Sequence, residues 1–128
     1  MAPVDVVVLD ASVVVDLLIR TGASLPADAV FIAPAHLDAE VLSALARLCR
    51  AGTLSQVAVD DMLQGLAELA VDRVDLRGLL QPAFVLRHNV SQHDSLYVAA
   101  AQQFDAALLT LDGRLAAACR QHGLCRVA

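Results

Sequence analysis

The sequence predicts a three-layer α/β sandwich, in which helices flank a mostly parallel central sheet of four to five strands. Short apolar runs rich in Val, Ala and Leu alternate along the chain with longer segments of helical periodicity. Only 3% of the residues are aromatic, which disfavours an aromatic-rich β barrel. We find no linker, low-complexity tract or repeat in the 128 residues, so we expect residues 1–128 to form a single domain.

The first expected strand covers residues 4–9, VDVVVL, a nearly continuous apolar run. Such a run is typical of a strand buried on both faces, as in a parallel sheet. The other expected strands cover residues 30–33, 71–76, 106–111 and 124–127, the last as an edge strand.

Helical periodicity is clearest in residues 36–50, where Leu37, Val41, Leu45 and Leu48 recur every three or four positions. Gly52 is expected to end this helix, because glycine readily adopts the left-handed conformation found after helices. The other expected helices cover residues 12–20, 55–70, 79–88, 91–104 and 114–121.

The charge balance is acidic, with a formal net charge of −5, and all nine basic residues are Arg. This disfavours tight non-specific binding of nucleic acid through phosphate contacts alone. Bound cations would reverse the local field, so a nuclease remains compatible with the charge. Receiver-type and haloacid-dehalogenase-type phosphoryl-transfer domains characteristically use a Lys, which this chain lacks. The glycine-rich motifs of dinucleotide and P-loop sites do not occur either.

Cysteine usage indicates a reducing compartment. The three cysteines, an odd number, show no CxxC spacing, so a disulfide framework is not expected. A zinc site from Cys119, His122 and Cys125 would lack a fourth ligand at standard spacing. The apolar runs are too short to span a bilayer, and no basic leader precedes the first of them. We therefore expect a cytoplasmic protein with no membrane association.

Four carboxylates fall at positions where an α/β fold can bring them together. Asp10 directly follows the first strand, and Asp112 follows the strand over 106–111. Carboxyl ends of parallel strands share one edge of the sheet, where ligands bind. Glu40 and Asp94 lie in the first turns of their helices, and some helix starts lie on that same edge. The four acids are predicted to converge on one cleft.

Each acid alone also has a structural explanation as a helix cap or a turn residue. Convergence favours a metal site, because two carboxylates about 5 Å apart repel each other by roughly 3 kcal/mol at an effective dielectric constant of about 20. Oxygen ligands favour Mg²⁺ or Mn²⁺. Asp94 shares a helix face with Val98 and Ala101, so it points toward apolar surroundings, where an acid needs a partner or a metal.

Three segments resemble the PIN-domain family. VVVLDASVVVDLL is similar to its opening strand and first acid, and APAHLDAEVLSALARL to the helix with its second acid. SQHDSLYVAAAQQFDAALLTLDGRLAAA is the most specific part, because it resembles the third acid, a Leu-Tyr-Val-Ala helix, a strand and a fourth acid. Length and order resemble VapC-type toxins of bacterial toxin–antitoxin pairs.

The resemblance implies a Mg²⁺- or Mn²⁺-dependent endoribonuclease with an RNA substrate, a cognate antitoxin and a homodimeric state. Four residues match the family's catalytic and metal-binding acids: Asp10, Glu40, Asp94 and Asp112. Ser12 and Thr110 match hydroxyls that would orient these carboxylates. Helical spacing alone does not decide between Asp38 and Glu40, and the family match selects Glu40. The alternative is a catalytically silent PIN-like module that binds protein or RNA and would bind Mn²⁺ weakly or not at all.

Overall fold

The computed structural model describes residues 4–20, 25 and 27–128 of the chain. The elements follow in the order β1 (Asp5–Leu9), α1 (Ala11–Ile19), β2 (Ala29–Pro34), α2 (Leu37–Arg50), α3 (Gln56–Glu68), β3 (Asp72–Val74), a short 3-10 helix (Leu76–Gly78), α4 (Leu80–Val85), α5 (Gln92–Gln103), β4 (Ala107–Leu109) and α6 (Gly113–Gln121). Every expected helix and four of the five expected strands are present, and β3 and β4 are shorter than expected. Within this described part, no helix is both long and apolar enough to cross a membrane.

The sheet confirms the predicted fold class. Within the described residues the sheet has four strands in the order β3-β2-β1-β4, and every neighbouring pair is parallel. The expected edge strand over 124–127 is reduced to an isolated bridge between Leu108 and Val127. The reason is the shortness of β4: only Leu108 exchanges backbone hydrogen bonds with this segment, through Arg126 and Ala128.

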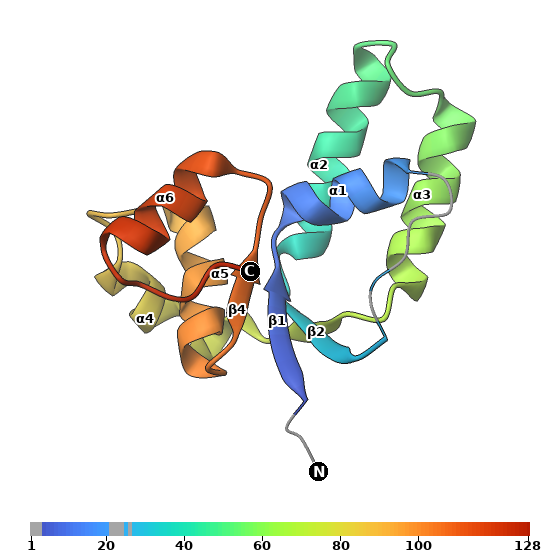
Figure 1. The fold of residues 1–128 in the computed structure, drawn as a ribbon. Coiled ribbons are helices and arrows are strands. Elements are labelled where there is room, and N and C mark those ends of the chain that lie inside the picture. Colours follow the sequence, from blue (N-terminus) through green and yellow to red (C-terminus); the bar gives the residue numbers. More distant parts are fainter. Residues whose placement is uncertain (1–3, 21–24, 26) are drawn as a thin grey trace.

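The order of the strands fixes where the helices lie. From β1 to β3 the chain moves across the sheet in one direction, and it then returns past β1 to β4. Because such crossovers are right-handed, α1, α2 and α3 cover one face, and α4 and α5 cover the other. Figure 1 shows this arrangement, with α6 on the side of α5. The direction reverses between β1 and β4, so this end of the sheet is the switch point where ligands bind in open α/β folds.

The core explains why the sheet and α5 lie so close together. Val98, Ala99, Ala100 and Ala101 are all at most 1% exposed. Their small side chains let α5 approach β1, β2 and β4, which it contacts.

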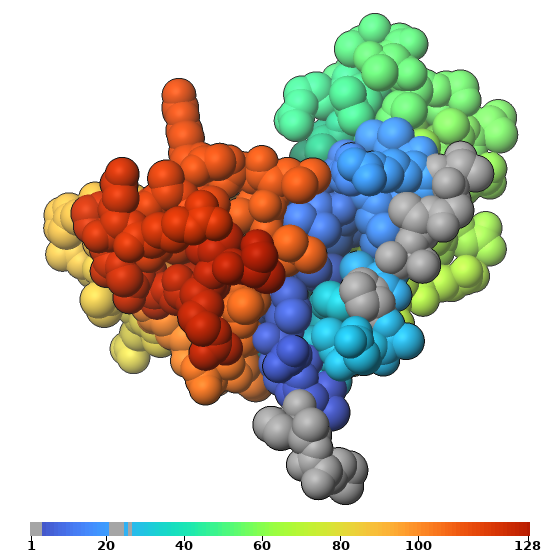
Figure 2. Space-filling model, viewed as in Figure 1, coloured from blue at the N-terminus to red at the C-terminus, as the bar shows by residue number. Residues whose placement is uncertain are grey.

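The end of α2 is as expected from the sequence. Gly52 follows α2 with a φ of 79°, so it adopts the left-handed conformation expected of the residue that ends this helix. Figure 2 shows that the surface is hollowed between the part of the molecule that contains α1 and α2 and the part that contains α5 and α6.

Candidate active site

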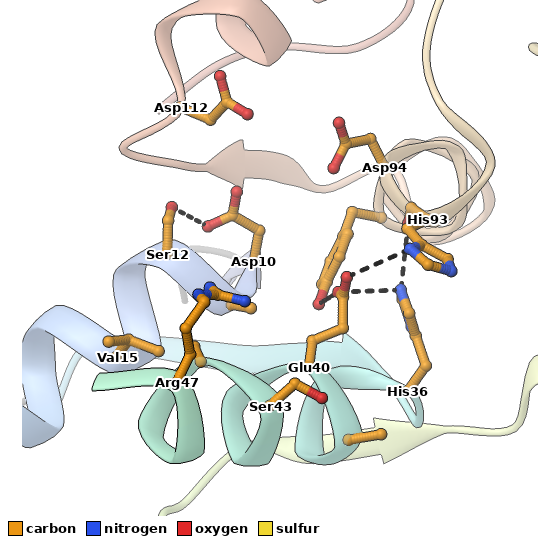
Figure 3. A pocket seen from close by; sticks show the side chains of 14 residues that line it. Asp10, Ser12, Val15, His36, Glu40, Ser43, Arg47, His93, Asp94 and Asp112 are labelled. Carbon is orange, nitrogen blue, oxygen red and sulfur yellow. Dashed lines mark hydrogen bonds and ion pairs between the residues drawn. The ribbon is translucent and has the colours of Figure 1, made fainter. Parts of the chain in front are cut away.

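A cleft of about 760 Å³ opens at the switch point of the sheet. Residues from α1, α2, α5 and the start of α6 line it, and all four predicted acids are among them. Figure 3 shows the four carboxylates arranged around the same space. The full lining is Asp10, Ala11, Ser12, Val15, His36, Ala39, Glu40, Ser43, Ala44, Arg47, His93, Asp94, Tyr97 and Asp112.

Asp10 is both a helix cap and the most deeply placed acid of the cleft. It follows β1, is only 5% exposed, and its Oδ1 accepts a 3.2 Å hydrogen bond from the Val13 amide at the start of α1. The Ser12 hydroxyl donates to the same oxygen at 2.6 Å, and the Thr110 hydroxyl donates to Oδ2. The capping explanation and convergence on the cleft are therefore both correct for this residue.

The same two hydroxyls connect Asp10 to the end of β4. Thr110 Oγ1 accepts a 2.9 Å hydrogen bond from the Asp112 amide, and Ser12 Oγ accepts one of 3.0 Å from the Leu111 amide. Asp112 itself caps α6, because its Oδ1 accepts from the Arg114 amide at 2.9 Å. The strand ends that carry Asp10 and Asp112 are thus held together by two hydroxyl groups.

Asp94 enters the cleft from the first turn of α5. The Ser91 hydroxyl caps this helix and accepts a 3.3 Å hydrogen bond from the Asp94 amide. Burial is the main cause that raises the pKa of Asp94 above its ordinary value of 3.8, and a hydrogen bond with Ser91 acts in the opposite direction. The carboxylates of Asp112, Glu40 and Asp10 raise the pKa further. Asp94 therefore lies close enough to the other three carboxylates for their charges to act on it.

Glu40 is held by residues that the sequence analysis missed. Tyr97, which is 1% exposed, donates a 2.5 Å hydrogen bond to Glu40 Oε1. His36 Nε2 lies 3.2 Å from the same oxygen, and His93 Nδ1 lies 3.8 Å from Oε2. Burial, followed by the hydrogen bond to Glu40, raises the pKa of Tyr97 above its usual range. Helical spacing gave a signal, because His36 stands one turn before Glu40 and Tyr97 one turn after Asp94.

Asp38, the alternative to Glu40, points to a different partner. Its carboxylate accepts hydrogen bonds of 2.9 and 3.2 Å from the Arg73 guanidinium. The same guanidinium donates to the carbonyls of Leu66 and Val71 at 2.8 and 2.6 Å, so it joins α2 to the end of α3. Asp38 does not line the cleft, whereas Glu40 does.

His93 and Arg47 line the cleft as well. His93 is 78% exposed and its Nδ1 lies 3.8 Å from Glu40 Oε2. Arg47 was not singled out in the sequence, although it lies seven residues after Glu40 on the same helix face. Arg114, two residues after Asp112, is not part of the lining.

The donor set of the cleft is chemically suited to a hard divalent cation, because its four acids offer only oxygen. Burial first, and then the three neighbouring carboxylates, raise the pKa of Asp94, and a bound cation would offset that negative charge. Over the described ranges, however, no three His, Cys, Asp or Glu side chains are grouped closely enough to hold a metal ion as they stand. This also applies to the zinc site considered for Cys119, His122 and Cys125.

The fold and the cleft together define a class: a small α/β domain with four carboxylates in a cleft at the switch point of a parallel sheet. Comparison with known proteins identifies the family within this class. The chain is 45% identical over 124 residues to Ribonuclease VapC3 of Mycobacterium tuberculosis, which covers 91% of this chain and 90% of the relative. It is 40% identical over 121 residues to Ribonuclease VapC1 of the same species, covering 89% and 91%. The chain therefore belongs to the VapC ribonuclease family, as its motifs predicted.

A solved structure supports the fold independently. The protein PAE2754 from Pyrobaculum aerophilum superposes with a TM-score of 0.66 over 90% of this chain and 80% of its own. The two sequences are only 20% identical, so the likeness concerns the fold alone. A scan against protein-family models gave no match.

Proposed function

We propose that this chain is a metal-dependent endoribonuclease that hydrolyses RNA phosphodiester bonds and acts as the toxin of a toxin–antitoxin pair. The observation that carries the proposal is the meeting of four carboxylates, from four separate parts of the chain, in one cleft of a VapC ribonuclease family member. A half-buried acid such as Asp94, beside three other carboxylates, is stabilised where a cation compensates the charge.

In this proposal Asp10, Asp94 and Asp112 ligate Mg²⁺ or Mn²⁺, directly or through water, and Glu40 completes the site or positions the attacking water. A bound divalent cation would supply a water of lowered pKa and would offset charge on the phosphoryl group. The residues of the chain set the directions of the carboxylates. Hydrolysis by in-line attack of water leaves a 5′-phosphate and a 3′-hydroxyl end.

The hydrogen bonds of the cleft support distinct roles for its polar residues. Ser12 and Thr110 donate to different oxygens of Asp10, so they fix its carboxylate in one orientation. Tyr97 and His36 both approach Oε1 of Glu40, which leaves Oε2 facing the exposed His93. These neighbours restrict the rotation of each acid before substrate arrives, which is the preorganisation that such sites require.

The direct test is cleavage of a single-stranded RNA by the wild type and by Asp10→Asn, with Mg²⁺, with Mn²⁺ and with EDTA. Asn keeps the shape of the side chain but removes its charge and replaces one oxygen acceptor by an amide donor, so the Mn²⁺ affinity of the variant is measured beside its cleavage rate. Asp60→Asn, an exposed acid on α3 outside the cleft, is the matched control. Equal cleavage by wild type and Asp10→Asn, or full activity in EDTA, would refute the proposal.

A catalytically silent module is the alternative, and Mn²⁺ binding separates the two. The nuclease should bind Mn²⁺ saturably in isothermal titration, and Asp10→Asn should weaken that binding. Absence of saturable binding at millimolar Mn²⁺, together with absence of cleavage, would favour the module.

The antitoxin would inhibit by placing an Arg among the carboxylates, since a guanidinium pairs readily with them. A copurified partner should then suppress cleavage at saturating ratio.

A homodimer is supported by the exposed apolar side chains of α4, Leu80, Phe84 and Val85, which are 54, 58 and 70% exposed. Light scattering of the purified chain tests this state. Three free cysteines are in keeping with a reducing cytoplasm, which thiol-trapping in cells would test.

A further inference from the structure

The wall of the cleft that α1 and α2 form carries more than acids. Val15 of α1 and Ser43, Ala44 and Arg47 of α2 line it, and none of them carries a negative charge. Because α2 rises about 1.5 Å per residue, the backbone of Arg47 lies roughly 10 Å along the helix from that of Glu40. The α2 wall therefore presents a guanidinium to the same cleft that holds the four carboxylates.

The Arg47 side chain is exposed and has no carboxylate partner in the described part of the chain. Arg73 and Arg77, in contrast, each pair with an Asp at 2.9 and 2.8 Å. Figure 3 shows the Arg47 side chain rising from α2 into the cleft. Its five N–H donors are thus available to a ligand on the cleft side.

An RNA strand meets an electrostatic difficulty at this cleft. The chain carries a net charge of −5, and four acids surround the place where a phosphate must bind. Cations would neutralise that phosphate, but the flanking phosphates would still face an acidic protein. An unpaired guanidinium on the wall of the cleft offsets this repulsion at one further phosphate, and its planar fork matches two phosphate oxygens.

We propose that Arg47 forms a phosphate-binding subsite for an RNA phosphodiester next to the scissile one, so that the strand lies along the wall of the cleft that α1 and α2 form. This inference rests on the proposed ribonuclease function. Ser43, one turn before Arg47 on α2, adds a hydroxyl donor on the same wall. Arg47 is a positioning residue: it holds the strand in register and takes no part in the bond change.

Steady-state cleavage of a short RNA by wild type, Arg47→Ala, Arg47→Lys and Arg50→Ala tests the subsite. Arg50 is the matched control, because it is exposed, lies in the last turn of the same helix and does not line the cleft. Arg47→Ala should raise KM roughly three- to tenfold, with little change in kcat. It should also reduce the salt dependence of log kcat/KM by about 0.7, the slope for one phosphate contact on a single strand. Arg47→Lys should be intermediate.

A second experiment locates the phosphate. Neutral methylphosphonates replace the phosphodiesters of the RNA one at a time. At the flanking position that Arg47 contacts, the replacement should lower the kcat/KM of the wild type. At that same position it should cause no further loss of kcat/KM in Arg47→Ala. Unchanged KM and salt slope in Arg47→Ala would overturn the subsite. An effect of Arg47→Ala only on inhibition by a protein partner would overturn it as well. If the wild type cuts no RNA, the proposed function fails first, so the two failures are distinguishable.

Discussion

Tyr97 and Glu40 lie 57 positions apart in the sequence, yet a 2.5 Å hydrogen bond joins the phenol hydroxyl to Glu40 Oε1. Tyr97 belongs to α5 and Glu40 to α2, helices that cover opposite faces of the sheet (Figure 1). The bond therefore joins the two outer layers directly, past the end of the sheet. It also couples an almost fully buried side chain to an acid of the cleft.

Tyr97→Phe is expected to reduce cleavage and stability together. The change keeps the ring in the core and removes the donor, so Glu40 loses its shortest hydrogen bond. Removal of one hydrogen bond to a charged group lowers the free energy of unfolding by about 1.5–3 kcal/mol, and loss of such support lowers activity about 10- to 100-fold. Urea unfolding and cleavage assays measure both. Wild-type kcat with reduced stability would show that Glu40 needs no orientation by Tyr97.

Thr110→Val tests the hydroxyl between Asp10 and Asp112. Valine keeps the shape but neither donates to Asp10 nor accepts from the Asp112 amide, as Thr110 does. We expect cleavage to fall about 10- to 100-fold and the Mn²⁺ affinity to fall with it, because the hydroxyl orients a proposed ligand. Thr110→Ser restores the donor and should recover most of the activity. If the valine variant retains full activity, Ser12 alone suffices to orient Asp10.

Several parts of the fold and the site follow from local rules in the sequence. Asp10 and Asp112 each follow a strand of one parallel sheet, so both lie at the edge that the carboxyl ends of the strands share. Asp94 was singled out because its helix face is apolar, and Val98 and Ala101 are indeed buried. These inferences need periodicity and element type, both of which are visible in a short window.

The contacts that sequence reasoning missed are long-range. Glu40 and Asp38 lie two residues apart in one helix, and local spacing does not separate them. The two acids differ in their partners. Arg73, which lies 35 positions from Asp38 in the sequence, binds the carboxylate of Asp38. The prediction of a strand over 124–127 was wrong for a similar reason. The extent of such a strand depends on the length of its partner β4, which local sequence does not give.

A pair of substitutions on α2 tests which of its acids serves the cleft. Asp38→Asn removes the charge that pairs with Arg73, and we expect a loss of about 1 kcal/mol or less in the free energy of unfolding, because the pair is partly exposed. Its cleavage should stay near the wild-type rate. Glu40→Gln should lose most of the cleavage. The opposite pattern, with Asp38→Asn inactive, would place the second acid at Asp38.

Asp94→Asn is expected to make the metal-free protein more stable at neutral pH. Burial and then the neighbouring carboxylates raise the pKa of Asp94 in the folded state above 3.8. The folded state consequently binds more protons than the unfolded state between 3.8 and the raised pKa, so stability falls as the pH rises through this window. At pH 7 the charged carboxylate destabilises the fold, and Asn removes that charge.

Thermal unfolding of both proteins at pH 3 and pH 7, with and without Mg²⁺, measures this effect. The Tm advantage of Asp94→Asn should be present at pH 7 and disappear at pH 3, below the ordinary pKa. Mg²⁺ should raise the Tm of the wild type more than that of the variant, because a ligand that binds the folded state stabilises it. Asp60→Asn controls for the loss of one negative charge outside the cleft. A variant less stable than wild type at pH 7 without metal would mean that its partners compensate the Asp94 charge, which removes the electrostatic argument for a cation at this place.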